Sequence, residues 1–456
     1  PRGIYFKPGK MLAVLANRTY RHLLLAQIIA LVGTGLATIA LGLLAYDIAG
    51  GDAGVVLGTA LAIKMAAYIG IAPIAGAFAD RVPRRALLVT LDLVRAAVAI
   101  CLPFVSEIWQ IYLLIFVLQS ASAAFTPTFQ ATIPDVLPDE RDYTRALSLS
   151  RLAYDMENIT SPLLAAALLT VINFHWLFSG TAVGFIASAL LVLSVTLPRP
   201  ERSSSRDTSI YAKTTRGIRI YLKTPRLRGL LAVTLAAAAA SSMVIVNTVV
   251  IVRDRLGMTQ QDVALTLAAY GFGSMAAAFI LPRILDRIPD RRVMLLSAAI
   301  LVAGLAALAW ISSIVPAGMT YWYILLGGWA VLGIAYSMSI TPSGRLLKRS
   351  ANAEDRPALF AAQFALSHIC WLITYPLVGQ LGAGVSMTAA FAAMAAIALF
   401  GTLLGLLLWP ASDPDAIAHD HPDLPADHEH LRRQHADGAS HAYVIDDLHE
   451  RWVGKP

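Results

Sequence analysis

Apolar stretches of about 20 residues recur along most of the chain and are separated by short polar segments. Each stretch is long enough to cross ~30 Å of hydrocarbon as a helix. A stretch such as 230–252 lacks the alternation of apolar and polar residues that a barrel strand requires. The pattern therefore predicts an all-α integral membrane protein. We expect transmembrane helices at 23–49, 54–79, 86–106, 108–131, 143–172, 176–197, 228–252, 262–281, 293–314, 320–344, 357–382 and 385–409.

A long polar segment at 198–227, rich in Ser, Thr and Arg, divides these twelve predicted helices into two sets of six. We expect one six-helix bundle over 1–197, a cytoplasmic linker over 198–227 and a second, pseudo-symmetric bundle over 228–410. The remaining residues, 411–456, form a tail rich in His and Asp. Such a composition predicts a disordered segment, which we expect on the cytoplasmic side.

Composition and charge agree with a membrane protein. Of the residues, 57% are hydrophobic and 14% are charged, against roughly 25% charged in soluble domains. Loops on one side of the predicted helices carry 27 Lys and Arg residues, whereas the other side carries Arg253 and Arg255. Because Lys and Arg collect on the cytoplasmic side, both termini are predicted to be cytoplasmic. This asymmetry accounts for the net charge of +7 without nucleic acid, and the excess of Arg (29) over Lys (7) favours a bacterial inner membrane.

Two internal correspondences support the division into halves. The loop after the second predicted helix, 80–85 (DRVPRR), matches the loop after the eighth, 286–292 (DRIPDRR). In the fifth and eleventh predicted helices, 152–163 matches 366–377, and both copies contain a proline at the same place. Self-similarity of this kind is the signature of an internal repeat.

The loop 76–85 resembles the G-x-x-x-D-R-x-G-R-R signature of the major facilitator superfamily, whose fold is built from parallel six-helix repeats. The resemblance covers residues 20–410. It departs from the signature at Pro83, which replaces the usual Gly, and at Pro282, which stands where Gly76 stands in the first copy.

The resemblance implies that the charges of this loop help to close the cytoplasmic face. The implied gate residues are Asp80, Arg81 and Arg85, with Asp92 and Arg95 nearby and Asp286 and Arg287 in the second copy. The alternative is a positive-inside loop whose charges cap helices.

No motif of a hydrolase, nucleotide-binding protein or zinc protease occurs in the chain. The protein is therefore predicted not to be an enzyme and to need no cofactor. Without a phosphate-binding loop, transport must be driven by an ion gradient or run downhill. A secondary transporter is the resulting expectation.

Ionisable residues inside a span cost roughly 2.5–3.5 kcal/mol each and need a reason to be there. Arg151 and Asp155 are four residues apart and could pair on one helix face. Glu157 lies about 200° around the helix from Asp155 and is expected to face the substrate pathway. The candidates for substrate or proton binding are Lys64, Arg151, Asp155, Glu157 and Asn158.

The repeat alignment sets Tyr154 against His368 and Met156 against Cys370, which places an imidazole and a thiol at the depth of the two carboxylates. This mixture suits Ni, Co, Zn or Fe(II). The alternative is that His368 is a buried hydrogen-bonding residue and Cys370 a small hydrophobic one.

The tail contains seven of the ten histidines, and His-rich tracts bind metals. The candidate ligands there are His419, His421, His428, His430 and His435. A solvated tail without metal is the alternative. A His-rich tail together with a histidine in the eleventh helix resembles the nickel-resistance exporters of the same superfamily. The apolar residues of 444–452 have helical spacing, which predicts a short docking helix.

These observations favour a secondary active transporter that works by alternating access. Proton-coupled efflux of a divalent metal such as nickel is the first hypothesis, because exchange for two protons cancels the ~4.6 kcal/mol that export costs against ~100 mV. Proton-driven efflux of a drug-like or siderophore-like molecule is the second. A membrane metal sensor or scaffold that transports nothing is a third. The expected partners are lipid, protons and the substrate, and we expect a monomer.

Overall fold

The computed structural model describes residues 12–78, 82–198, 210–352, 355–413, 416–418, 440–446, 448–449 and 451–452. Within them, the first six long helices are α2 (Arg18–Ala49), α3 (Ala53–Phe78), α4 (Arg84–Cys101), α5 (Ile108–Val136), α6 (Glu140–Leu168) and α7 (His175–Leu193). The second six are α9 (Pro225–Val250), α10 (Gln260–Leu285), α11 (Asp290–Ile314), α12 (Met319–Ile340), α14 (Arg356–Gly384) and α15 (Met387–Leu408). We call these sets the N-terminal half and the C-terminal half.

Shorter elements connect the long helices. The described part of the chain contains η1 (Leu12–Ala16), η2 (Gly50–Asp52), η3 (Leu102–Phe104), the π-helical turn η4 (Ile251–Arg255), α8 (Ile210–Lys223), α13 (Ser343–Arg349), β1 (Ala416–Ala418) and β2 (Ser440–Ala442). Helix α8 falls in the segment expected to be a linker, and it packs on α14.

The prediction of an all-α membrane protein built from two sets of six helices is confirmed. Ten described stretches are long and apolar enough to cross a membrane. The first of them, Arg18–Ile71, contains α2 and most of α3. The two helices are separated at Gly50, whose φ of 54° suits glycine. Helix α6 is not one of these stretches, because its first half carries several charged residues and is too polar.

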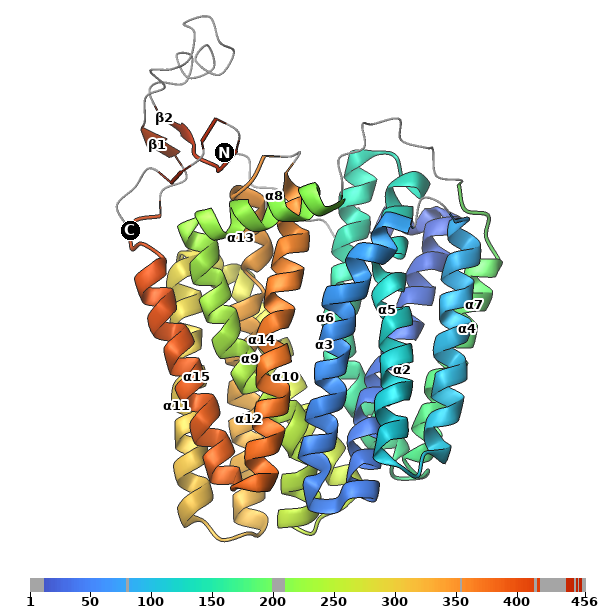
Figure 1. Cartoon of the computed structure of the whole chain (residues 1–456), viewed down its shortest axis with the longest axis vertical. Coiled ribbons are helices and arrows are strands. Elements are labelled where there is room, and N and C mark those ends of the chain that lie inside the picture. The colour runs from blue at the N-terminus through green and yellow to red at the C-terminus, as the bar shows by residue number, and fades with distance from the viewer. Residues whose placement is uncertain are drawn as a thin grey trace, which may run out of the picture.

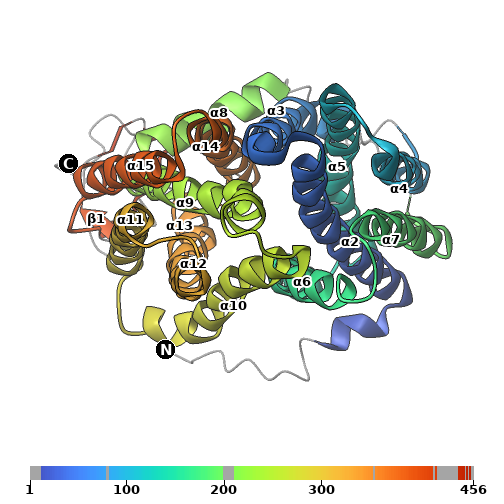
Figure 2. The same ribbon diagram turned by 90° about the horizontal axis from the view of Figure 1, so that it is seen from below.

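The two halves are separate bundles that meet along two pairs of helices. Seen along the helix axes, α3 lies beside α14 and α10 lies beside α6 (Figure 2), and both pairs are in contact. Helix α8 and the two strands lie at the same end of the bundles (Figure 1). We call this end the α8 face, and the end that contains the η2 turn the η2 face.

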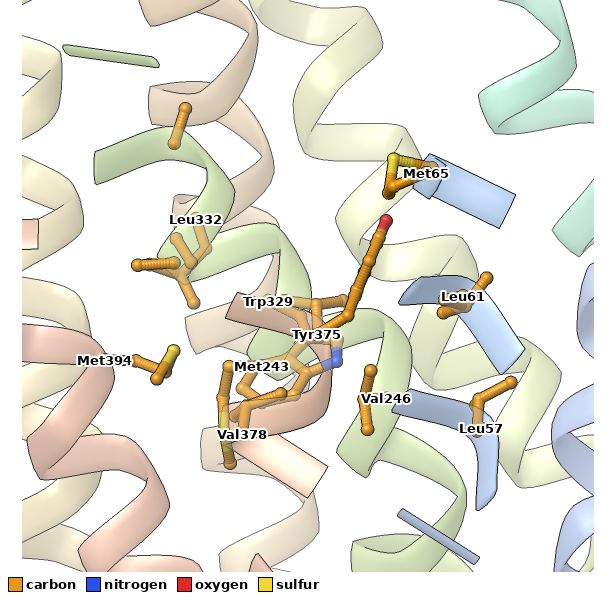
Figure 3. Close-up of a cluster of buried hydrophobic side chains, with 14 of the residues drawn as sticks. Leu57, Leu61, Met65, Met243, Val246, Trp329, Leu332, Tyr375, Val378 and Met394 are labelled. Carbon is orange, nitrogen blue, oxygen red and sulfur yellow. The ribbon is translucent and has the colours of Figure 1, made fainter. Parts of the chain in front are cut away.

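The hydrophobic core is continuous between the halves only toward the η2 face. One cluster joins Leu57, Leu61 and Met65 of α3 to residues of the C-terminal half such as Tyr375 and Val246 (Figure 3). A second cluster, built from the ends of α2, α4, α5, α6 and α7 at the α8 face, stays within the N-terminal half. The halves therefore share a core at the η2 face and have separate cores at the α8 face.

The described residues of the C-terminal tail include two short strands. Strands β1 and β2 pair antiparallel, with Ala416 opposite Ala442. The prediction of a short helix over 444–452 is wrong, because the described residues of this stretch are not helical. Tyr443, Val444 and Ile445 are consecutive and all buried, and two of them join the core of the C-terminal half. Burial of three consecutive residues is not expected of a helix that docks through one face.

Candidate functional site

Two ionisable side chains lie at the boundary between the halves. Lys64 is on α3 and Glu157 is on α6, the two helices of the N-terminal half that face α14 and α10. Both side chains are half-buried. Gly35 of α2 permits close approach of α6, since a Cβ there would overlap Ser161, and it would lie in ordinary contact with the Glu157 Cγ at 3.5 Å. The sequence therefore places an ammonium and a carboxylate on the two helices where the bundles meet.

An aromatic cluster from both halves lies next to Lys64. The Tyr68 ring of α3 stacks on His368 of α14 at 5.5 Å, and Phe364 lies 4.0 Å from His368. The Trp371 ring centre lies 6.4 Å from that of His368. The Trp371 indole N–H donates to Ser241 Oγ at 2.8 Å, which fixes the ring. We call Tyr68, Phe364, His368 and Trp371 the aromatic cluster. Lys64 interacts electrostatically with His368 and has its Nζ 5.9 Å from the Tyr68 ring centre.

The predicted metal pair does not converge. His368 has its Nδ1 2.6 Å from the Phe364 carbonyl oxygen and belongs to the aromatic cluster. Cys370 lies two residues further, about 200° around α14, and is buried with its thiol near the Leu366 carbonyl. In the described ranges no three His, Cys, Asp or Glu side chains are grouped as metal ligands. The geometry fits the alternative interpretation, a packed histidine and a small hydrophobic cysteine.

Several predicted residues cannot be placed. The tail histidines His419, His421, His428, His430 and His435, and the gate residues Asp80 and Arg81, lie outside the described residues. Arg151, Asp155 and Asn158 belong to α6, but their side chains are outside the described part as well. Their roles stay predictions.

The described charges of the first repeat loop tie together helices of one half. Arg84 pairs with Asp135 of α5. Arg85 donates to the carbonyl of Leu193, at the end of α7. Both contacts lie at the α8 face, where they fix the start of α4 to its neighbours.

The second repeat loop makes the matching contacts in the C-terminal half. Asp290, which corresponds to Arg84, pairs with Arg345 of α13 at 3.6 Å, so the positions of acid and base are exchanged. Arg291 donates to the carbonyl of Trp409, at the end of α15, as Arg85 does at the end of α7. The predicted gate residues Asp286 and Arg287 are exposed.

Asp92 and Arg95 form a buried ion pair inside the N-terminal half. Ser188 of α7 donates to the Asp92 carboxylate at 2.7 Å. The Arg95 guanidinium lies 4.1 Å and 4.5 Å from the rings of Phe125 and Phe185. This pair joins α4, α5 and α7 away from the boundary between the halves, which favours a structural role over a gate.

The η2 face is closed by direct contact between helix backbones. A Cβ at Gly54 would come within 2.9 Å of Asn247 Oδ1, and one at Gly58 would overlap the carbonyl of Tyr375. Asn247 donates to the carbonyl of Val378 at 3.2 Å. Small residues permit such close approach of membrane helices. At the same end, Arg253 of η4 lies 5.4 Å from the Tyr46 ring of α2.

Sequence reasoning missed Tyr68, Gly54 and Gly58. Glycines in a membrane helix are common, and nothing marks which of them touch another helix. Tyr68 lies four residues after Lys64, one turn along the same helix face, and this spacing was the available signal.

Comparison with known proteins gives a family and a fold. Residues 23–325 and 230–434 match the family model described as Major Facilitator Superfamily. An uncharacterized MFS-type transporter, YfiS of Bacillus subtilis (strain 168), is 23% identical over 326 residues, which cover 69% of this chain and 74% of that protein. Macrolide efflux protein A of Streptococcus pyogenes is 22% identical over 290 residues, covering 61% of this chain and 70% of that protein.

Solved structures of transporters share the fold. The nucleoside transporter NupG superposes with a TM-score of 0.66 at 13% identity, covering 86% of this chain and 100% of that chain. A D-xylose-proton symporter gives a TM-score of 0.61 at 12% identity, covering 88% and 98%.

Proposed function

Because the chain belongs to the Major Facilitator Superfamily and is a secondary membrane transporter, we propose that it exports a cationic, amphipathic organic molecule in exchange for protons. The observation that carries this proposal is the placement of Lys64 and Glu157 on the two helices at the boundary of the halves, with the aromatic cluster next to Lys64. A carboxylate attracts a cation, and aromatic faces bind both cations and apolar rings. The similarity to macrolide efflux protein A supports export of an organic molecule.

Glu157 is proposed to be the group that protons and substrate share. A half-buried carboxylate in a membrane span binds either a proton or a cation, because an unpaired charge is expensive there. Lys64 neutralises Glu157 when neither is bound. Exchange then follows from competition, since proton binding releases the substrate and substrate binding releases the proton.

The α8 face is proposed to be cytoplasmic. The Lys and Arg bias of the loops supports this orientation, which places the linker and the tail inside the cell. The halves have separate cores at the α8 face and a shared core at the η2 face. In this orientation the contact at the η2 face closes the side away from the cytoplasm, and the proposed site receives its substrate for export from the cytoplasmic side of a bacterial inner membrane.

Export of a divalent metal is the weaker of the two transport hypotheses. The described residues place His368 among aromatic rings and direct Cys370 elsewhere, which leaves a single carboxylate and no soft ligand at the site. A sensor or scaffold is disfavoured because family membership makes the chain a carrier.

The test uses purified protein in liposomes that contain a trapped pH dye. We expect organic cations such as tetraphenylphosphonium to move protons, and Ni²⁺, Co²⁺ and Zn²⁺ to move none. Glu157→Gln should abolish the proton signal. The matched control is Asp47→Asn, because Asp47 is an exposed carboxylate near the η2 end of α2.

A proton signal with the metals and none with organic cations would replace the proposal with metal exchange. An undiminished signal in Glu157→Gln would remove Glu157 from the coupling. A loss in Asp47→Asn equal to that in Glu157→Gln would show that the effect is not specific to the site.

A further inference from the structure

A small cavity lies inside the N-terminal half, next to Lys64. Its volume is ≈ 20 Å³, which is room for about one water molecule or one ammonium group. Helices α2, α3, α5 and α7 and the η3 turn line it. Its polar lining consists of Thr34, Thr38, Lys64, Gln119 and Ser122. We call it the Gln119 cavity.

The hydroxyl groups of this lining present acceptors. Thr34 donates its hydroxyl hydrogen to the carbonyl of Ala30 at 2.9 Å, and Thr38 donates to that of Thr34 at 3.0 Å. Ser122 donates to the carbonyl of Leu118 at 2.9 Å. Because each hydroxyl hydrogen already takes part in a hydrogen bond, the hydroxyl oxygens can only accept further hydrogen bonds.

Gln119 adds an acceptor without a donor. Its side chain is 7% exposed, and its Oε1 accepts no hydrogen bond from the described residues. A buried amide oxygen without a donor is unfavourable, so such a group calls for an explanation. Lys64 is the charged donor in the lining of the same cavity, and an ammonium has three N–H groups and no acceptor.

We propose that the Gln119 cavity is a second position for the Lys64 ammonium, which it occupies when a cationic substrate holds Glu157. This inference rests on the proposed function. A substrate cation at Glu157 removes the partner of Lys64 and repels it, and an ammonium without a partner is unfavourable inside the membrane. Gln119, with the hydroxyls of Thr34, Thr38 and Ser122, then receives the ammonium. Gln119 is a positioning residue that acts through Lys64.

The test measures the Kd of tetraphenylphosphonium for the purified full-length protein and its variants. Gln119→Leu removes the acceptor, so Lys64 stays at Glu157 and binding should weaken about tenfold. Gln119→Glu holds Lys64 in the cavity and should tighten binding. In a Lys64→Met background, neither substitution should change the Kd. A purely structural role of Gln119 would weaken binding in both variants and in both backgrounds.

The matched control is Gln27→Leu, because Gln27 is also buried and its Oε1 also accepts no described hydrogen bond, but it does not line the cavity. Its Kd should equal that of the unmodified protein. Parallel changes in Gln119→Leu and Gln119→Glu, or an unchanged Kd in Gln119→Leu, would overturn the inference alone. Undiminished binding to Glu157→Gln would overturn the proposed function and this inference with it.

Discussion

The two halves have the same six-helix fold but different interiors. The N-terminal half carries Lys64, Asp92, Arg95 and Glu157 inside its spans, together with further charges on α6. In the C-terminal half, the spans contain no Asp, Glu, Lys or Arg from 263 to 282, from 293 to 344 or from 357 to 412. It contributes to the boundary the three α14 members of the aromatic cluster, Phe364, His368 and Trp371, and the helix backbone that contacts the glycines of α3 at the η2 face.

The difference indicates a division of labour within a repeated fold. A charged side chain inside a membrane has a large free-energy cost, so it is retained where it has a functional or structural role. The N-terminal half is proposed to bind protons and the charge of the substrate, while the C-terminal half provides a neutral aromatic surface. At Asp92 and Arg95, the repeat offset of 206 residues places Ala298 and Leu301 in the C-terminal half, both buried.

The largest effect is expected from separating the halves where they touch. Gly58→Leu adds a side chain where a Cβ alone would overlap the Tyr375 carbonyl, so the η2 face cannot close. Uphill transport should fall to background. A cysteine placed at Val246, which is fully buried, should become accessible to an impermeant maleimide.

The control for this prediction is Gly70→Leu on the same helix, because a Cβ at Gly70 would meet nothing within 4 Å. It should transport normally. Uphill flux in Gly58→Leu within twofold of the unmodified protein would show that the η2 contact need not close.

The buried ion pair tests whether charge in the N-terminal half is structural as well as functional. Asp92→Asn leaves Arg95 without its buried carboxylate, which typically costs 3–5 kcal/mol. The double variant Asp92→Ala, Arg95→Leu copies the C-terminal half and should recover most of that stability, because apolar replacement of a whole buried pair is often neutral. Thermal unfolding in detergent measures both. A double variant less stable than either single variant would contradict this account.

The aromatic surface of the C-terminal half should affect affinity more than rate. Trp371→Ala removes a ring anchored by Ser241 and should raise the KM for an organic cation roughly 5- to 30-fold, the equivalent of a 1–2 kcal/mol cation–π contact. Trp371→Phe should keep most of the affinity. Trp310→Ala is the control, since Trp310 is exposed on α11. An unchanged KM in Trp371→Ala would place the substrate elsewhere.

The smallest effect is expected at the described tail segment 443–446, which packs on the C-terminal half. Burial alone would raise the pKa of Asp446, but hydrogen bonds and the charge of His449, with a further bond from the Leu448 amide, lower it to about 2. The Asp446 carboxylate therefore stabilises docking above its ordinary pKa and loses this effect as the pH falls toward 2. At pH 7, Asp446→Asn should speed hydrogen exchange at Tyr443 and Ile445 severalfold. Unchanged exchange there would show that Asp446 does not hold the segment.

Most of the fold could be predicted from the sequence because a membrane span must be long and apolar. The observed ends of helices such as α9 and α14 lie within a few residues of the predicted ones. The tail could not be predicted in this way. The apolar residues around Val444 and Ile445 have helical spacing, yet they are buried against the C-terminal half in an extended segment, which only tertiary contacts determine.

The site was predictable where it depends on charge and not where it depends on packing. Lys64 and Glu157 stand out in the sequence because ionisable residues in spans are rare. The prediction of a metal pair at His368 and Cys370 considered depth and overlooked their angular separation on one helix. The proposed roles of Tyr68 and Gln119 depend on neighbouring residues of other helices, α14 and α2. A local sequence pattern does not reveal such neighbours.

The central claim is that proton and substrate compete for Glu157, and proton release on binding tests it most directly. In weakly buffered detergent solution, at a pH where Glu157 carries a proton, adding tetraphenylphosphonium to the purified protein should acidify the medium. The Asp47→Asn variant should acidify it to the same extent. Glu157→Gln should release no proton. Acidification by Glu157→Gln equal to that of the unmodified protein would contradict the account.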